Sequence, residues 1–273
     1  MMATPNSDDP FPRGRPAAAI CRVACILTAL VEPIFAQNPK VATPLTNTAA
    51  YFTVQAEKAF HAARARFLAD TNNAEATWQF GRACFDRAEF SATPAQRSAV
   101  AAEGIAACRP LPATVPTLAA GHYYLAMNLG QMARTKSVGA LPLVAEMETL
   151  FHAALALDPS FDYAGPDRCL GLLYRDAPVW PASIGNRIKA RQHLTRAAEI
   201  APGSPENHLN LLETFLRWSE PNNAQRQWKA LAQCLPAART NFAGQAWAAS
   251  WADWDKRRAA VESKLREAPR PLR

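Results

Sequence analysis

Small and large apolar residues recur at helical spacing along the C-terminal half of the chain, and the arrangement appears twice. Residues 170–202 and 211–236 each contain a short apolar stretch followed by an Ala-rich amphipathic one. Pro202 and Pro236, which close these segments, are 34 residues apart. Apolar residues at i, i+3, i+4 and i+7 predict amphipathic helices, and proline does not continue a helix. The pattern therefore predicts pairs of antiparallel helices that repeat along the chain, each pair ending at a proline.

The same reading extends in both directions. Residues 122–159 form a third unit, and residues 78–108 form a looser fourth one. Upstream, residues 48–68 predict a lone amphipathic helix that caps the stack. Downstream, residues 242–267 predict a long, partly polar helix. Its tryptophans lie three or four positions apart, which is typical of one stripe packed on the last repeat rather than of a cofactor site: Trp247, Trp251 and Trp254. A unique helical bundle is the alternative architecture.

The residues at the repeated positions resemble the tetratricopeptide pattern, whose period is about 34 residues. In the last unit the matching residues are Leu211, Phe215, Ala224, Trp228, Leu231 and Pro236. In the preceding unit they are Leu170, Gly171, Tyr174, Ala190, Leu194, Ala197 and Pro202. The resemblance implies an all-α, right-handed tetratricopeptide-repeat solenoid of about four helix pairs with flanking capping helices.

Extra residues interrupt the repeats. Residues 175–187 and 133–142 lie between the two helices of a unit, and residues 161–168 precede one. Such insertions form loops on one side of a solenoid and often serve binding. Together with the aromatic-rich stretch 122–130, they resemble the T-component proteins of TRAP transporters, over residues 74–236. That resemblance implies a periplasmic protein that associates with a substrate-binding protein and holds a hydrophobic ligand. Members of that family are commonly lipid-anchored, whereas this sequence has no convincing lipoprotein motif.

Candidate binding residues follow from the repeat register, because the first helix of each tetratricopeptide unit lines the concave face. The candidates from that face and from the insertion 175–187 are Trp78, Arg82, Tyr123, Met127, Arg168, Arg175, Trp180 and Arg187. Aromatic residues mixed with arginine suit an amphipathic helix, an extended peptide or an acid with a hydrocarbon tail. Each has a structural alternative: Tyr123 as core, Arg168 as part of a helix start, Trp180 as a plug of its loop and Arg187 as an exposed charge.

The N-terminal segment has the layout of a secretory signal peptide. Basic residues precede an apolar run at 23–31, and Pro33 and Ala36 follow it. The run is far shorter than the ~20 residues that span a bilayer. Cleavage near Ala36 predicts a periplasmic or secreted mature chain with no transmembrane span. An N-terminal anchor or a misassigned start is the alternative.

The expected organisation follows from these segments. It is a signal peptide at 1–36, a linker at 37–46, the solenoid at 47–245, a C-terminal capping helix at 246–268 and a tail at 269–273.

Composition and charge narrow the function classes. Hydrophobic residues make up 49% of the chain and only 11 residues are glycine, which favours a helical protein with a sizeable core. The net charge of +7 suits an anionic ligand, an acidic partner or a membrane surface. The basic residues form no run, which argues against nucleic acid as a partner. The hypothesis that the protein binds an anionic polymer is therefore supported by the net charge alone.

The cysteines and the motif search point to no catalytic or metal-binding chemistry. Cys84 and Cys108 fall on successive predicted helices and are the favoured disulfide pair, with buried free thiols as the alternative. No zinc motif is present, no cofactor is expected, and nothing matches a nucleophile or metalloprotease motif. The sequence therefore predicts a non-catalytic binding protein that engages a partner protein and a small organic acid or hydrophobic ligand. The alternative is a generic periplasmic scaffold that binds a peptide in its concave groove.

Overall fold

The computed structural model describes residues 45–136 and 138–267. The predicted leader, most of the linker and the tail lie outside this part of the chain. Over the described residues the all-α prediction is confirmed, with one isolated bridge between Val179 and Gly185 and no strand. The helices are α1 (Leu45–Ala69), α2 (Ala74–Glu89), α3 (Pro94–Cys108), α4 (Leu111–Thr114), α5 (Ala119–Ala133), α6 (Leu141–Leu157), α7 (Phe161–Asp176), α8 (Arg187–Ile200), α9 (Pro205–Arg217), α10 (Pro221–Asn241), the 3₁₀ turn η1 (Gln245–Trp247) and α11 (Ala248–Glu267).

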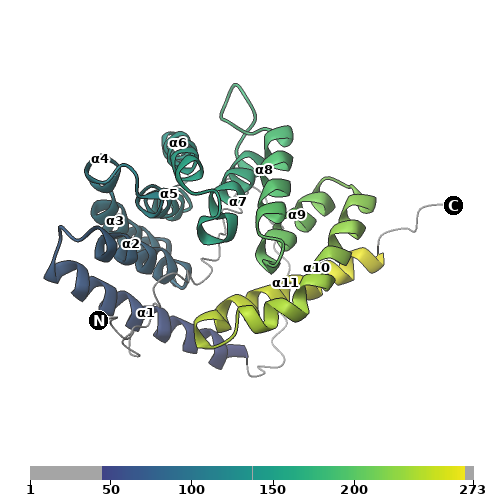
Figure 1. The fold of residues 1–273 in the computed structure, drawn as a ribbon, viewed down its shortest axis with the longest axis horizontal. Helices are drawn as coiled ribbons and strands as arrows, with labels where there is room; N and C mark the ends of the chain where they lie inside the picture. The colour runs from purple at the N-terminus through teal and green to yellow at the C-terminus, as the bar shows by residue number, and fades with distance from the viewer. Residues whose placement is uncertain (1–44, 137, 268–273) are drawn as a thin grey trace, which may run out of the picture.

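Successive helices pack in pairs: α2 with α3, α5 with α6, α7 with α8, and α9 with α10. The pairs form an arc in which α2, α5, α7 and α9 make the inner row and α3, α6 and α8 the outer row (Figure 1). Helix α1, which the sequence predicted, packs on α2 at one end of the arc, and α11 packs on α9 at the other. The two ends approach each other where the Gln245 side chain donates a hydrogen bond to the Tyr51 hydroxyl. The inner row is therefore flanked by helices from both ends of the chain.

Helix boundaries follow local chemistry. Asn73 and Asn186 cap α2 and α8, each with a side-chain oxygen that accepts from backbone N–H groups of the first turn. Thr93 does the same for α3, where Pro94 occupies the first helical position. Pro159 and Pro202 follow the ends of α6 and α8, as the repeat pattern predicted.

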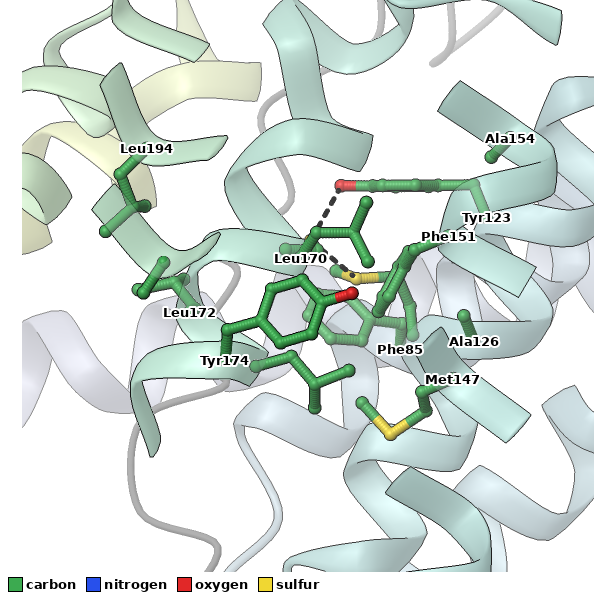
Figure 2. Close-up of a cluster of buried hydrophobic side chains, with 14 of the residues drawn as sticks. Phe85, Tyr123, Ala126, Met147, Phe151, Ala154, Leu170, Leu172, Tyr174 and Leu194 are labelled. Carbon is green, nitrogen blue, oxygen red and sulfur yellow. Dashed lines mark hydrogen bonds between the residues drawn. The ribbon is translucent and has the colours of Figure 1, made fainter. Parts of the chain in front are cut away.

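The core runs between the two rows. Nearly every residue of α5 is buried, because this helix is packed between α2, α3, α6 and α7. Figure 2 shows buried side chains where α2, α5, α6, α7 and α8 meet. The Tyr123 and Phe151 rings meet edge to face, with centroids 5.8 Å apart. Fully burying one such side chain contributes about 2 kcal/mol, so this cluster is a major source of stability.

The C-terminal region differs from the expectation. Pro236 was predicted to end a repeat, but it lies inside α10, which continues to Asn241. Pro236 and Ala232, whose carbonyl loses its helical hydrogen bond, are both exposed, so water can satisfy that carbonyl. The helix predicted over 242–267 begins only at Ala248. Gly244 adopts a φ of 90°, which a right-handed helix does not allow, so the helix cannot extend back through it. The tryptophan stripe packs inward as predicted: Trp247, Trp251 and Trp254 are buried.

Two insertions are loops as predicted, between α5 and α6 and between α7 and α8. The Trp180–Pro181 peptide bond in the second is cis. The third insertion is different: residues 161–168 belong to α7, and Asp162, Tyr163 and Ala164 adopt left-handed backbone angles within it. The regular helix begins only after this turn, which places Pro166 where a helix tolerates proline.

The favoured disulfide is not formed. Cys84 and Cys108 are free and buried, which was the alternative that the sequence left open. Burial raises the pKa of the Cys108 thiol to about 12, so it stays protonated and packs as a small apolar side chain.

The close approach of α7 and α8 at Gly171 yields a testable prediction. A methyl group at this position would lie 2.6 Å from Cγ of Leu194 and 3.0 Å from its backbone nitrogen. We expect Gly171→Ala to lower the free energy of unfolding by about 2 kcal/mol, measured by urea denaturation.

The matched control is Gly203→Ala, because no atom lies within 4 Å of a methyl group placed there. We expect this substitution to raise the free energy of unfolding by about 0.5 kcal/mol, because alanine lowers the conformational entropy of the unfolded chain. Equal effects of the two substitutions would contradict a tight α7–α8 contact.

Candidate functional site

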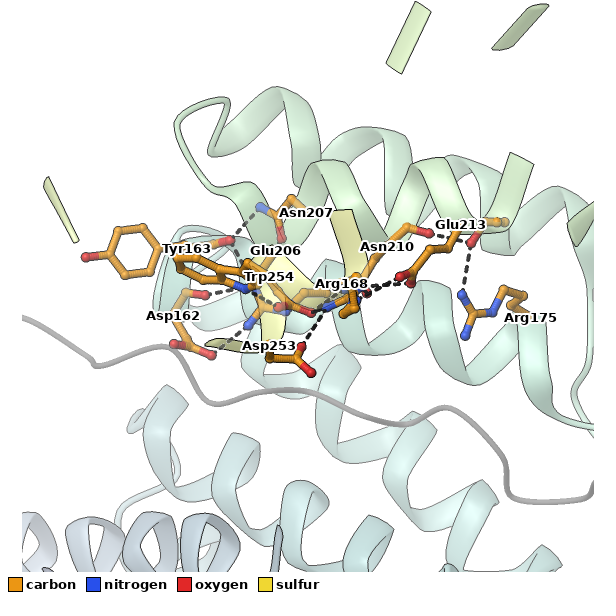
Figure 3. Close-up of polar contacts among 12 residues, drawn as sticks. Asp162, Tyr163, Arg168, Arg175, Glu206, Asn207, Asn210, Glu213, Asp253 and Trp254 are labelled. Atoms are coloured by element: carbon orange, nitrogen blue, oxygen red, sulfur yellow. Dashed lines mark hydrogen bonds and ion pairs between the residues drawn. The ribbon is translucent and has the colours of Figure 1, made fainter. Parts of the chain in front are cut away.

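A buried ion pair connects three helix pairs on the inner row. Nη2 of Arg168 lies 2.7 Å from Oδ2 of Asp162, and their side chains are 1% and 0% exposed. The Tyr123 hydroxyl, from α5, donates to the same carboxylate oxygen at 2.7 Å. Nη1 of Arg168 donates to Oδ1 of Asn207 on α9 at 3.0 Å. Figure 3 shows this pair beside the residues of α9. One guanidinium thus connects α7 to α9 and, through Asp162, to α5.

The left-handed turn at 162–164 aims backbone carbonyls at this guanidinium. Nη1 of Arg168 donates to the carbonyls of Asp162 at 3.1 Å and Tyr163 at 3.2 Å. Nδ2 of Asn207 donates to the Tyr163 carbonyl at 2.9 Å. A non-glycine residue in the left-handed region costs about 1 kcal/mol, and three adjoining residues adopt it here. The turn persists because these contacts hold it.

Arg82 and Tyr124 lie next to this pair. Nε of Arg82 is 3.6 Å from the Asp86 carboxylate one helical turn away. Burial raises the pKa of Asp86 to about 6, and Arg82 partly offsets that rise. Trp78 stacks on Tyr124 with ring centroids 5.7 Å apart. Burial also raises the pKa of the Tyr124 hydroxyl, which Arg82 and Asp162 influence electrostatically, so this hydroxyl stays protonated.

The buried polar atoms of this cluster that have no hydrogen-bond partner include one hydroxyl and one carboxylate oxygen. They are the Tyr124 hydroxyl and Oδ1 of Asp162, both buried and without a partner among the described residues. Buried polar atoms are nearly always hydrogen-bonded, and each exception calls for an explanation. The cluster of Trp78, Arg82, Tyr123, Tyr124, Asp162 and Arg168, called the inner-face cluster below, therefore has an unused donor and an unused acceptor.

A second buried network fastens α11 to α9 (Figure 3). Nη1 of Arg257 donates to Glu206 at 2.9 Å, and two other nitrogens of its guanidinium donate to Glu213 at 2.8 Å each. Trp254 donates to Glu206 at 2.6 Å. Burial would raise the pKa of Glu206, but Arg257 and Arg168 outweigh it and hold that pKa below its usual value. Glu206 therefore stays ionised in the core.

His193 belongs to a third group. Its Nδ1 lies 2.7 Å from Oδ1 of Asp167, and its ring stacks on Tyr174 with centroids 5.5 Å apart. His152 of α6 contacts both rings, and burial lowers the pKa of His152. The group connects α6, α7 and α8 on the side of α7 that faces the outer row.

The structure brings five of the eight candidate residues together. These five lie on α2, α5 and α7: Trp78, Arg82, Tyr123, Met127 and Arg168. The Cys169 thiol of α7 donates to Sδ of Met127 on α5, with the two sulfur atoms 3.6 Å apart. Tyr123 and Arg168 are both buried, and for Tyr123 a position in the core was the structural alternative.

The other three candidates lie elsewhere. Arg175, at the end of α7, pairs with Asp176 and donates to Thr214. Trp180 and Arg187 lie on and beside the α7–α8 loop, where Trp180 is exposed and Arg187 pairs with Glu220. These residues do not join the inner-face cluster.

Sequence reasoning missed Asp162 and Asn207. The stretch 161–168 was singled out as an insertion, yet nothing in it announces that Asp162 turns back toward Arg168. Residues i and i+6 do not lie on the same face of a regular helix, so the spacing of Asp162 and Arg168 does not predict a contact. The left-handed turn brings them together. Asn207 two residues after Pro205 looks like an ordinary residue of a helix start.

The remaining features are weaker candidates. An open pocket of about 640 Å³ lies between the start of α7, the α8–α9 turn and the end of α10. Tyr163 is the one ionisable side chain that lines it, so nothing there selects for charge. Within residues 45–136 and 138–267, no group of three His, Cys, Asp or Glu side chains is suited to hold a metal ion. None of the helices described is both long and apolar enough to cross a membrane.

No family model matches this chain, and no curated protein matches it significantly.

The Glu206 network predicts a pH-dependent stability. A carboxyl whose pKa is lowered by folding stabilises the fold above its unfolded pKa of 4.5, and that contribution is lost as the pH falls through the folded pKa. We expect Glu206→Gln to lower the free energy of unfolding at pH 7 by about 3 kcal/mol. The variant should also lose less stability than the wild type between pH 5 and pH 3. Urea denaturation across that range measures both.

Glu262→Gln serves as the control, because this α11 carboxyl pairs with Arg266 on the exposed surface. We expect a change of at most about 0.5 kcal/mol there. If Glu206→Gln lost as much unfolding free energy between pH 5 and pH 3 as the wild type, Glu206 would not be the group that titrates.

Proposed function

We propose that this chain is an exported, non-catalytic helical-repeat binding protein, similar to the T-components of TRAP transporters. Its inner helices hold a small organic acid or a hydrophobic ligand, and it works with a partner protein in the periplasm. The tetratricopeptide character of its helix pairs is part of this proposal. Support comes from the paired packing of α2 to α10 and from the repeat pattern in the sequence.

The observation that carries the ligand proposal is that the Tyr124 hydroxyl and Oδ1 of Asp162 have no hydrogen-bond partner in the inner-face cluster. Leaving a buried donor or acceptor unpaired costs about 1–3 kcal/mol. The Tyr124 hydroxyl is a donor that can serve a carboxylate, and Oδ1 of Asp162 is an acceptor that can serve a hydroxyl. A ligand that offers both groups offsets both costs at once.

The surroundings favour an acid with an apolar body. Arg82 adds positive charge beside Tyr124, and arginine is well shaped for carboxylates. Trp78 and Tyr124 form a stacked aromatic wall next to these groups. A few placed polar groups within an aromatic lining are typical of small-molecule sites. We therefore propose a small hydroxylated or otherwise polar organic acid as the ligand class.

Tyr124→Phe tests this proposal. The hydroxyl has no described hydrogen-bond partner, so its removal should leave the stability of the empty chain unchanged or slightly higher. The same change removes the donor that the ligand would use. We expect native mass spectrometry of gently purified protein to show a retained small molecule on the wild type and at least about tenfold less of it on the variant, which corresponds to one lost hydrogen bond to a charged group.

Tyr174→Phe is the matched control. The Tyr174 hydroxyl donates to Glu148 at 2.5 Å and lies 3.0 Å from Nε2 of His152, outside the inner-face cluster. This variant should lose stability and retain the ligand. Equal ligand retention by wild type and Tyr124→Phe would contradict the role of Tyr124. A bare wild-type chain would favour the alternative, a scaffold that binds a protein segment.

A further inference from the structure

The α7–α8 loop presents apolar side chains to solvent. Trp180 is 82% exposed, and Val179 and Ile188 are each 70% exposed. Such side chains are normally scattered singly over a surface, whereas these three lie on one loop and the first turn of the helix that follows it. The loop projects beyond the ends of the helices (Figure 1). We call this surface the loop tip.

The loop tip is held in shape by hydrogen bonds at its base. The Gly185 amide donates to the Pro178 carbonyl at 2.7 Å, and the Asn186 amide donates to the Tyr174 carbonyl at 2.9 Å. A side chain on Gly185 would collide with the Ala177 carbonyl oxygen, so the two arms of the loop touch. The exposed residues are therefore carried on an ordered projection, which lowers the entropy cost of binding through them.

Positive charge surrounds the loop tip and exceeds the carboxylates near it. Asp176 is shared by Arg175 and Arg217, and Glu220 is shared by Arg187 and Arg191. Each carboxylate thus neutralises one of two guanidinium groups. Lys189 and Arg226, both exposed, add further positive charge to this region.

The placement of these cations opposes local helix stability. Arg187, Lys189 and Arg191 lie in the first turns of α8, and no acidic residue occupies its first turn. The N-terminus of a helix carries partial positive charge, so cations are unfavourable there. Aromatic rings hold these cations in place instead: Lys189 lies over Tyr174 at 4.8 Å, and Arg187 and Arg191 lie over Trp218 at 4.7 Å and 5.2 Å. Their positive charge is therefore kept at the surface beside the loop tip.

We infer that the loop tip docks on an anionic lipid surface, with Trp180, Val179 and Ile188 entering the headgroup region and the surrounding Arg and Lys side chains contacting lipid phosphates. Tryptophan favours the membrane–water interface, and basic residues near it bind anionic leaflets. The apolar groups project rather than line a hollow, which suits a soft, flat surface. An acidic protein partner would instead be expected to meet a recessed or extended apolar patch. This inference is independent of the inner-face ligand.

Vesicle co-sedimentation of the full chain tests it. The probes are vesicles of phosphatidylcholine alone and vesicles that contain about one third phosphatidylglycerol. We expect the wild type to bind the anionic vesicles and to release them as salt rises. The double variant V179S/W180S should bind them at least about tenfold more weakly, because it loses the apolar insertion. The variant R187Q/K189Q should bind more weakly and with less salt dependence.

Leu68→Ser together with Val54→Ser is the matched control, since these exposed apolar side chains lie on α1, away from the loop tip. All variants carry the same N-terminal segment, so any membrane affinity of that segment cancels. Binding by V179S/W180S equal to that of the wild type would overturn the inference. So would an equal loss in the α1 control, or a wild-type chain that binds no anionic vesicle, which would point to an acidic protein instead.

Discussion

The buried pair of Arg168 and Asp162 is the contact on which the inner row of this fold depends. Both side chains are removed from water, and such a pair is stable only where the remaining hydrogen-bonding groups are also satisfied. Tyr123, Asn207 and two backbone carbonyls supply most of those partners, and Oδ1 of Asp162 is the carboxylate oxygen that is left without one. As a result, the positions of α5, α7 and α9 are fixed relative to one another by a single charge.

The same pair explains why the chain tolerates a left-handed turn at 162–164. Three non-glycine residues in that conformation are costly alone, but the turn directs the Asp162 carboxylate and two carbonyls toward the guanidinium. The distorted start of α7 and the buried charge therefore support each other. The Glu206–Arg257 network repeats this solution at the end of the array, where it attaches α11. In both places charge is buried in a paired form, but in the inner-face cluster the Tyr124 hydroxyl and Oδ1 of Asp162 are left without a hydrogen-bond partner.

Much of the fold could be predicted from the sequence because it depends on local periodicity. Apolar spacing identified the helix pairs, and Pro159 and Pro202 marked helix ends. Pro236 was misread because proline tolerance depends on whether the freed carbonyl faces solvent, which only the packing decides. Asp162 was missed for a similar reason, since its left-handed conformation follows from a partner six residues away. The leader and the resemblance to TRAP T-components remain predictions.

A double-mutant cycle on Arg168 and Asp162 tests the central claim most directly. Arg168→Met keeps the length of the side chain, and Asp162→Asn keeps a residue that accepts the left-handed region. Urea denaturation of the wild type, both single variants and the double variant gives the coupling energy between the two side chains. The account predicts a coupling of about 2 kcal/mol or more. Additive effects, within about 0.5 kcal/mol, would contradict it and would show that apolar packing alone positions the inner helices.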